Sequence, residues 1–79
     1  YILLCKGNTY YTGYTDNVER RFETHKAGKG AKYTKAFPPV KILYTQEFKT
    51  KSEAMRAEAM IKRLTRKQKD ELIRKGWPH

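Results

Sequence analysis

Cysteine, proline and long apolar runs are all scarce in this 79-residue chain, and each scarcity excludes a class of protein. The single cysteine, Cys5, leaves no partner for an intrachain disulfide and no thiolate cluster for a metal, so we expect it to fill the core of a protein from a reducing compartment. No apolar run approaches the ~20 residues of a membrane-spanning helix, and no signal-peptide pattern is visible. We therefore expect a cytoplasmic protein with no membrane partner.

Acidic residues are also few, which leaves a large positive charge. Asp and Glu number 8 against 18 Lys and Arg, so the formal net charge is +10, and it is spread along the whole chain. Such a charge attracts polyanions, chiefly nucleic acid and less specifically anionic membrane surfaces or acidic proteins. An interaction domain without a nucleic-acid partner would leave this charge without a role, and that class of function is disfavoured.

Apolar and turn residues predict one α+β domain over residues 1–79. YILLC and YYTGY flank Gly7 and Asn8, which tolerate positive φ, and so predict a β-hairpin. VKILYTQEF, residues 40–48, predicts a third strand. With three helices the order is β-β-α-β-α-α, which is typical of a small, three-stranded, largely antiparallel sheet covered by helices.

Capping-box patterns, with Asp or Thr three residues before Glu or Gln, predict where those helices begin. The pairs are Asp16 with Glu19, Thr50 with Glu53, and Thr65 with Gln68. The first helix is expected over 17–27 and stops at Gly28, while the other two follow one another with a break near Leu64. The intervening segment GKGAKYTKAFPP is predicted to be a loop with room for one helical turn.

Helical spacing separates the two adjacent arginines of the first helix. The i, i+3, i+4, i+7 stripe through Val18 and Phe22 also contains Arg21 and His25, whereas Arg20 falls toward solvent. Arg21 and His25 are polar groups at positions where an ordinary amphipathic helix would carry leucine. Both are therefore candidates for a site.

The next helix places one carboxylate in an apolar stripe. The stripe is Ala54, Ala57, Glu58, Ile61 and Leu64, and a carboxylate there is costly unless a cation, a metal or hydrogen-bond donors meet it. Spacing alone favours a simple explanation, in which Arg21 and Glu58 form an ion pair between helices. A functional explanation needs further residues.

The second strand offers such residues. Gly13 inside a strand indicates a backbone that another group approaches closely, and alternation puts Tyr11 on the same face as Gly13. Tyr11 is thus predicted to point toward the helix that carries Arg21. Taken alone, a tyrosine at such a position is more often a half-buried strand residue than a catalyst.

Together these residues resemble the motifs of the GIY-YIG nuclease superfamily, and specifically its small stand-alone bacterial members. Tyr1-Ile2-Leu3 stands in the place of the first motif, without its glycine, and Tyr11-Thr12-Gly13 in the place of the second. Arg21 and His25 match the R-x-x-x-H of the following helix, and Glu58 matches the helix glutamate. The resemblance covers almost the whole chain.

The resemblance implies metal-dependent cleavage of a phosphodiester. In the family the glutamate holds a single divalent cation, usually Mg²⁺, with Mn²⁺ as the other candidate. One tyrosine is the general base for the attacking water, the other positions water or phosphate, the arginine binds the scissile phosphate, and the histidine assists orientation. The implied catalytic residues are Tyr1, Tyr11, Arg21, His25 and Glu58, with Glu58 as the metal ligand, and which tyrosine is the base stays open.

Basic residues outside this constellation predict contacts with the phosphate backbone of a nucleic acid. Each alone is more often a solvated surface group, but with the net charge they predict salt-dependent, weakly sequence-selective binding. The predicted nucleic-acid-binding residues are Gly13, Lys29, Lys32, Tyr33, Lys35, Arg63 and Arg66.

Two functions from different classes remain. The first is a DNA endonuclease, either structure-selective or weakly selective, linked to repair or recombination. Branched or single-stranded DNA is among its candidate substrates, and no small-molecule cofactor is expected. The second is a nucleic-acid-binding module of the same fold with little or no cleavage. The five catalytic positions carry chemically competent residues, which favours the nuclease.

Overall fold

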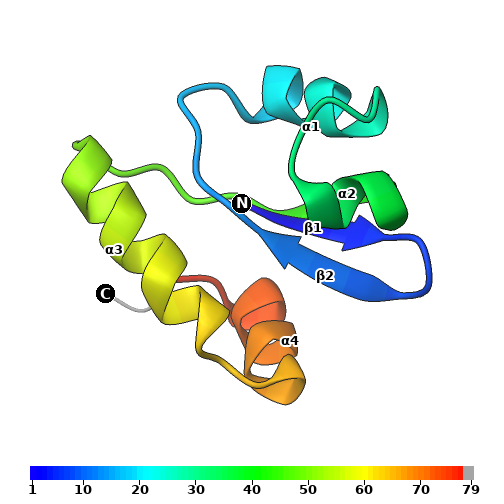
Figure 1. Cartoon of the computed structure of the whole chain (residues 1–79). Helices are drawn as coiled ribbons and strands as arrows, with labels where there is room; N and C mark the ends of the chain where they lie inside the picture. Colours follow the sequence, from blue (N-terminus) through cyan, green and yellow to red (C-terminus); the bar gives the residue numbers. More distant parts are fainter. Residues whose placement is uncertain (78–79) are drawn as a thin grey trace. The chain divides into compact units, whose positions relative to one another are not determined.

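The computed structural model of the protein describes residues 1–77, which divide into two compact units, Tyr1–Thr45 and the part that begins at Gln46. The first unit holds the sheet with helices α1 and α2, and the second holds helices α3 and α4 (Figure 1). The predicted α+β fold, with a three-stranded antiparallel sheet, is confirmed.

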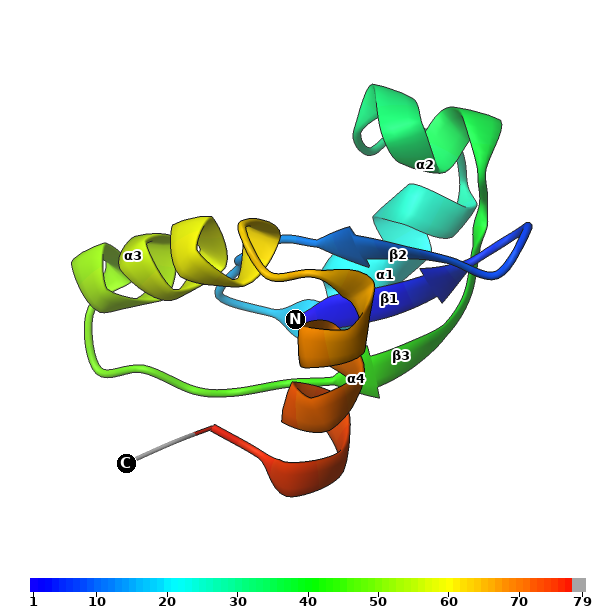
Figure 2. The ribbon, with the colours of Figure 1, turned by 90° about the horizontal axis from the view of Figure 1, so that it is seen from below.

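The sheet is built around its first strand. Strands β1 (Ile2–Cys5), β2 (Thr9–Thr12) and β3 (Pro39–Tyr44) lie in the order β2-β1-β3, and both pairs are antiparallel (Figure 2). The β1–β2 turn is made by Gly7 and Asn8 at φ 82° and 59°, as the sequence predicts. Because β1 has neighbours on both sides, its apolar side chains form the core of this unit.

The third strand ends earlier than its sequence pattern predicts. The pattern extends to residue 48, but β3 stops at Tyr44. Tyr44 is the partner of Ile2, the first paired residue of β1. Residues beyond Tyr44 have no strand to pair with on that side, and β-propensity alone does not keep them extended.

The first helix and its N-cap each lie one residue later than predicted. Helix α1 spans Val18–Lys26, and Asn17 rather than Asp16 is its N-cap, with Asn17 Oδ1 accepting from the Arg20 amide at 3.0 Å. The prediction of Asp16 as the cap is therefore wrong. Both residue types cap well, and the extended backbone of Asn17, at φ −149° and ψ 97°, decides between them.

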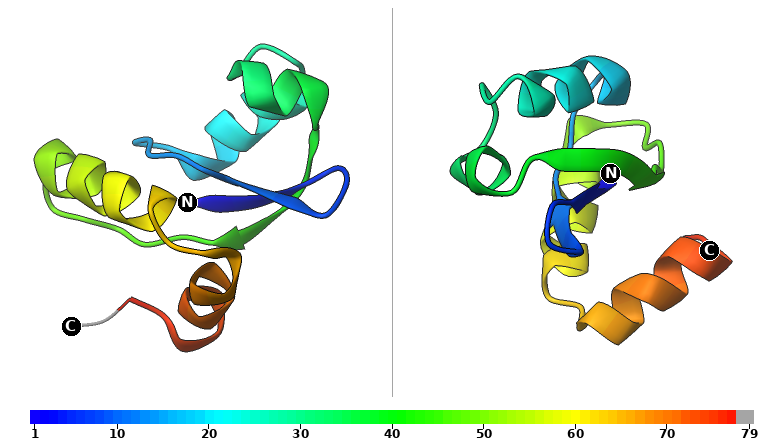
Figure 3. Two further views of the ribbon diagram at one scale, coloured as in Figure 1. Left: turned by 60° about the horizontal axis from the view of Figure 1, so that its bottom comes forward. Right: turned by 90° about the vertical axis from the view of Figure 1, so that its right-hand side faces the viewer.

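A short second helix lies within the segment predicted to be a loop. Helix α2 spans Lys32–Ala36, so the single turn for which the sequence left room is present. Both α1 and α2 lie on the same side of the sheet (Figure 3, left), and α2 adjoins the β1–β2 hairpin. This arrangement surrounds one end of the sheet with residues from α1 and α2.

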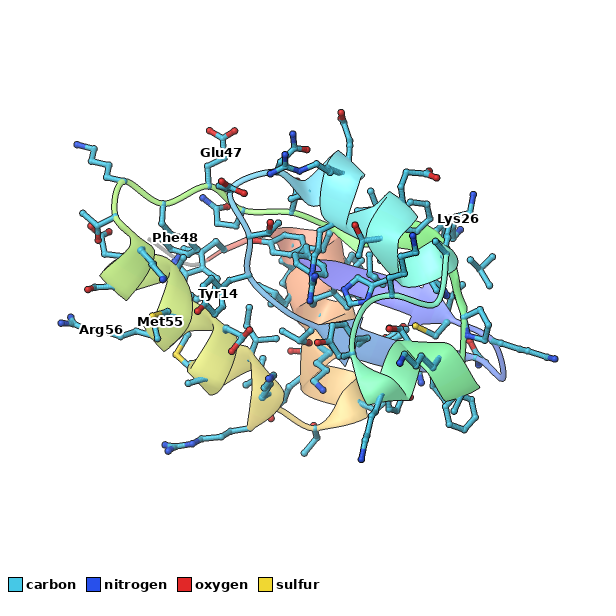
Figure 4. All side chains as sticks on the ribbon, turned by 45° about the horizontal axis from the view of Figure 1, so that its top comes forward. Tyr14, Lys26, Glu47, Phe48, Met55 and Arg56 are labelled. Atoms are coloured by element: carbon cyan, nitrogen blue, oxygen red, sulfur yellow. The ribbon has the colours of Figure 1, made fainter. Side chains whose placement is uncertain are left out.

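The second unit is a pair of helices, α3 (Lys51–Lys62) and α4 (Arg66–Lys75). Both predicted caps are confirmed, because the Thr50 side chain accepts from the Glu53 amide and Thr65 forms a full capping box with Gln68. Buried Ala57 and Ile61 confirm the apolar stripe of α3, while Met55 and Arg56 lie on its exposed side (Figure 4). No helix within residues 1–77 has the length and apolar character needed to cross a membrane.

Candidate active site

Tyr1 and Gly13 form the base of the site. The Tyr1 backbone nitrogen donates to the Gly13 carbonyl at 2.9 Å, and the Gly13 amide donates to the Tyr1 carbonyl at 3.1 Å, so the hairpin continues beyond its last regular pair. The Tyr1 ring lies on the Gly13 backbone, where a Cβ would be 2.5 Å from the phenolic oxygen. The predicted close approach at Gly13 is confirmed, and the approaching group is Tyr1.

His25 is held at three points. Its side chain is fully buried, its Nε2 lies 2.9 Å from the Tyr1 hydroxyl, and its Nδ1 lies 2.7 Å from Thr34 Oγ1 on α2. Beneath the ring is Gly30, where any Cβ would collide with the imidazole. The ring therefore has one orientation, set by Tyr1, by Thr34 of α2 and by the loop that joins α1 to α2.

Burial also fixes the charge of this ring. Desolvation lowers the pKa of His25 below its ordinary value of 6.5, and the positive charge of Arg21 lowers it further. His25 is thus neutral at physiological pH. It can accept one hydrogen bond and donate one, but it does not add a positive charge to the site.

Tyr11 extends the site along β2. Its ring centroid lies 5.0 Å from that of His25 and 6.4 Å from that of Tyr1, so it faces α1 as alternation predicts. On its other side Tyr33 is stacked at 5.9 Å with an interplanar angle of 26°, and Tyr33 in turn contacts Phe37 at 5.2 Å. Tyr33 and Phe37 are 37% and 40% exposed, so an aromatic row leads from the buried histidine to the surface.

Arg21 and Arg20 have the different environments that helical spacing predicts. Arg20 is exposed and lies 3.9 Å from Asp16. Arg21 is half-buried, and within the described Tyr1–Thr45 unit no carboxylate forms an ion pair with it. A half-buried guanidinium without a counter-ion in its own unit suits a site that receives an anion.

Glu58 is in the second unit, on α3. Its side chain is 20% exposed and lies 3.5 Å from Lys62 one turn along the helix. Among residues 1–77 no group of three or more histidine, cysteine or acidic side chains is arranged to hold a metal. A lone carboxylate fits Mg²⁺, which keeps several waters and is often bound through one or two carboxylates and substrate phosphates. The Arg21–Glu58 ion pair and the metal-binding role of Glu58 both stay predictions.

The remaining predicted nucleic-acid-binding residues lie on helices or in the loop before them. Lys29, Lys32 and Lys35 are exposed in the loop before α2 and on α2 itself. Arg63 is the C-cap of α3, and Arg66 begins α4, where it lies 3.7 Å from Asp70. The exposed Lys26 side chain, at the end of α1, lies 5.4 Å from the ring of Phe22 (Figure 4).

Comparison with known proteins decides the family. The GIY-YIG catalytic domain matches residues 1–71. The chain belongs to the GIY-YIG family. This GIY-YIG chain is 58% identical to a UPF0213 protein of Staphylococcus haemolyticus over 73 residues, which cover 92% of this chain and 89% of that protein. A UPF0213 protein of Streptococcus agalactiae is also 58% identical, over 87% of this chain and 78% of that protein.

A solved structure agrees with the fold. The solution NMR structure of the UPF0213 protein BH0048 from Bacillus halodurans is 48% identical, with a TM-score of 0.61 over 99% of this chain and 84% of that chain. The family is one of nucleases, so the chain carries a nuclease-family domain of a kind found in small bacterial proteins and generally associated with nucleic acid and divalent metal ions.

Sequence reasoning missed three residues of this site. Thr34 and Gly30 contact His25, and Phe37 ends the aromatic row. Gly30 had a detectable signal, since Gly28 already provides the helix stop at φ 76° and a second glycine two residues later had no such purpose. Thr34 had none, because a threonine in a polar loop is common and its partner lies on another element.

Proposed function

We propose that this protein is a metal-dependent endonuclease that hydrolyses phosphodiester bonds in DNA. The observation that carries the proposal is the convergence of Tyr1, Tyr11 and His25 beside a half-buried Arg21 that has no acidic partner in its own unit. A structural cluster would neutralise that charge, whereas a phosphate-binding site leaves it for the substrate. The family membership supports the same reaction class.

Arg21 is proposed to bind the scissile phosphate. Its planar guanidinium presents donors that match two phosphate oxygens at once, and they neutralise part of the charge that repels an attacking water. His25, uncharged and buried next to it, does not compete for the same anion. Arg21 is the only predicted catalytic side chain of this unit with a fixed positive charge, and we assign it to phosphate binding.

Tyr1 is the better candidate for the general base of the two tyrosines. Its hydroxyl lies 2.9 Å from His25 Nε2, so a neutral base is within hydrogen-bond distance of the phenol. As the water proton moves to the Tyr1 oxygen, the Tyr1 proton can move to Nε2, which leaves a neutral tyrosine and an imidazolium. Tyr11 then has the second role, positioning water or phosphate.

Glu58 is proposed to hold the divalent cation, Mg²⁺ or Mn²⁺. When bound, the cation would polarise the phosphoryl group and stabilise the leaving oxygen. The carboxylate is mostly shielded from solvent, and among the described residues it forms an ion pair with Lys62, whose side chain is half exposed. Affinity for the free cation should be weak, because one carboxylate provides few ligands.

The substrate surface is proposed to combine the aromatic row with the lysines of α2. Tyr33 and Phe37 are exposed rings, and base stacking on such rings contributes ~1–3 kcal/mol per base. Lys29, Lys32 and Lys35 supply charge for the phosphates, and Arg63 and Arg66 extend the basic surface of the second unit. We propose DNA with unpaired or branched segments as the substrate of this surface. Such DNA occurs in repair and recombination, and the proposed setting of the protein is the cytoplasm.

A cleavage assay tests the proposal. Labelled single-stranded, duplex, flapped and branched DNA and RNA are incubated with Mg²⁺ or Mn²⁺ and with chelator. We expect metal-dependent cleavage by the wild type, loss of at least ~10²-fold in Arg21→Ala and Glu58→Gln, and near wild-type rates in the controls Arg20→Ala and Glu71→Gln. Binding without cleavage of any substrate would favour the binding module instead. No binding at low salt would contradict both functions.

A further inference from the structure

We propose that Thr34 is a positioning residue of this site, whose hydroxyl keeps the proton of neutral His25 on Nδ1 so that Nε2 accepts from Tyr1. The inference rests on the proposed function and adds to it a residue that touches neither substrate nor metal. Through His25, Thr34 would determine the orientation of the Tyr1 hydroxyl.

The hydrogen bonds of Thr34 determine its role toward His25. Thr34 is fully buried, and its hydroxyl donates to the Ala31 carbonyl at 2.9 Å. A hydroxyl has one proton, so toward His25 Nδ1, at 2.7 Å, the same oxygen can only accept. With the hydroxyl proton directed at the Ala31 carbonyl, the short contact requires a proton on Nδ1.

The position of the proton on His25 also determines the direction of the hydrogen bond between Nε2 and Tyr1. A neutral imidazole with its proton on Nδ1 has an acceptor at Nε2, so the Tyr1 hydroxyl at 2.9 Å donates to it. A phenol whose proton is directed at His25 presents lone pairs, and not its proton, to any third group. That is the orientation in which Tyr1 can receive a proton from an attacking water.

Other groups around His25 do not replace Thr34. The ring faces Tyr1, which precedes β1, Tyr11 of β2 and the charged Arg21 of its own helix, and it rests on the Gly30 backbone. Within the described part of the chain none of these four forms a hydrogen bond with Nδ1, and full burial keeps bulk water away. Without the Thr34 oxygen, the proton is better placed on Nε2, where the Tyr1 oxygen can accept it, and Tyr1 must then turn its own proton elsewhere.

NMR of the histidine ring tests this without any assay of cleavage. The chain has two histidines, so a His79→Gln background leaves His25 as the single ring signal. Two-bond ¹⁵N–¹H spectra of the ¹⁵N-labelled protein at pH 7.5 should give a protonated Nδ1 and an unprotonated Nε2. Thr34→Val, which removes the hydroxyl at nearly constant volume, should move the proton wholly or partly to Nε2. Thr34→Ser should retain the wild-type pattern.

A wild-type His25 protonated on Nε2 would overturn the proposal, whether or not the variants fold. A Thr34→Val ring that keeps its proton on Nδ1 would overturn it as well.

Kinetics provide the second measurement. Thr34→Val should lower kcat by at least about tenfold with KM nearly unchanged, as expected for a histidine in the wrong tautomer, and Thr34→Ser should restore most of the rate. Equal rates in Thr34→Val and the wild type would overturn the positioning role. Absence of cleavage by every form would contradict the proposed function instead, and the NMR result would still decide the role of Thr34.

Discussion

Two glycines of this protein lie directly beneath rings of the candidate active site. A Cβ on Gly13 would be 2.5 Å from the Tyr1 hydroxyl, and one on Gly30 would collide with His25. Neither glycine has positive φ, whereas Gly28 has φ 76° and open space around it. Glycine is thus required for two different physical reasons in this part of the chain. Gly13 and Gly30 leave room for a ring, whereas Gly28 allows a positive φ.

This difference predicts different outcomes for two alanine variants. Gly13→Ala should displace the Tyr1 ring and lower cleavage by roughly 10²-fold, because a shift of about 1 Å in a catalytic group has that effect. Gly28→Ala should lower the free energy of unfolding by ~1 kcal/mol through backbone strain and leave the rate nearly unchanged below the melting temperature. Rates and denaturation curves of both variants provide the measurement, and a fully active Gly13→Ala protein would contradict the assignment of Tyr1.

His25 predicts a pH dependence of stability. Its pKa is lowered in the folded state by burial and by Arg21, so just below ~6.5 the unfolded chain takes up a proton that the folded chain does not. The free energy of unfolding should therefore fall as the pH is lowered from 7.5 to 5.5, and be fully restored above ~6.5. Chemical denaturation at several pH values measures this.

His25→Gln is the control for that measurement. The variant should be less stable, but its stability should be nearly flat between pH 7.5 and 5.5, since carboxylates titrate mainly below ~4.5. An equal decline in wild type and variant would assign the effect to another group.

At the scale of elements, the start of α1 differs from its prediction because adjacent residues both cap well. Asp16 and Asn17 are each favourable N-caps, and Glu19 three residues after Asp16 completed the pattern of a capping box. The structure uses Asn17, and Asp16 instead lies 3.9 Å from Arg20 on the exposed surface. The choice depends on backbone angles that the turn before the helix imposes.

A pair of alanine variants measures that choice. Asn17→Ala should lower the free energy of unfolding by ~1 kcal/mol, because the Arg20 amide loses its acceptor. Asp16→Ala should change it by no more than ~0.5 kcal/mol, the range of an exposed ion pair. Denaturant titrations under one set of conditions provide the comparison, and a larger effect at Asp16 would restore the cap that the sequence suggested.

At the scale of the whole molecule, the net charge of +10 predicts strongly salt-dependent binding of nucleic acid. The logarithm of the binding constant for a single-stranded oligonucleotide should fall linearly with the logarithm of salt concentration, with a slope of about −0.7 per phosphate contact. A Lys32→Gln/Lys35→Gln protein should show a slope shallower by about 1.4. Lys49→Gln/Lys51→Gln removes the same charge from residues outside the predicted binding set, and it should change the slope less. Equal slopes in the two double variants would contradict a specific role for α2.

Much of this protein follows from patterns that act over a few residues. Alternation of side chains in strands and their period of about 3.6 residues in helices both follow from local backbone geometry. These patterns predicted the hairpin, the helices and the inward placement of Arg21 and His25. The motif spacing led to the GIY-YIG family. The sequence alone thus determined the α+β class, the family and the inward side of the first helix.

The arrangement within the site was decided only by tertiary structure. Thr34 and Tyr1 meet on the ring of His25 from positions 9 and 24 residues away in the chain, and no local period relates such positions. The proposed proton on Nδ1 and the need for Gly30 follow from those contacts, since Thr34 lies against Nδ1 and the buried ring leaves no room for a side chain beneath it. Local backbone geometry determined which residues face inward, and tertiary packing determined which residues each of them contacts.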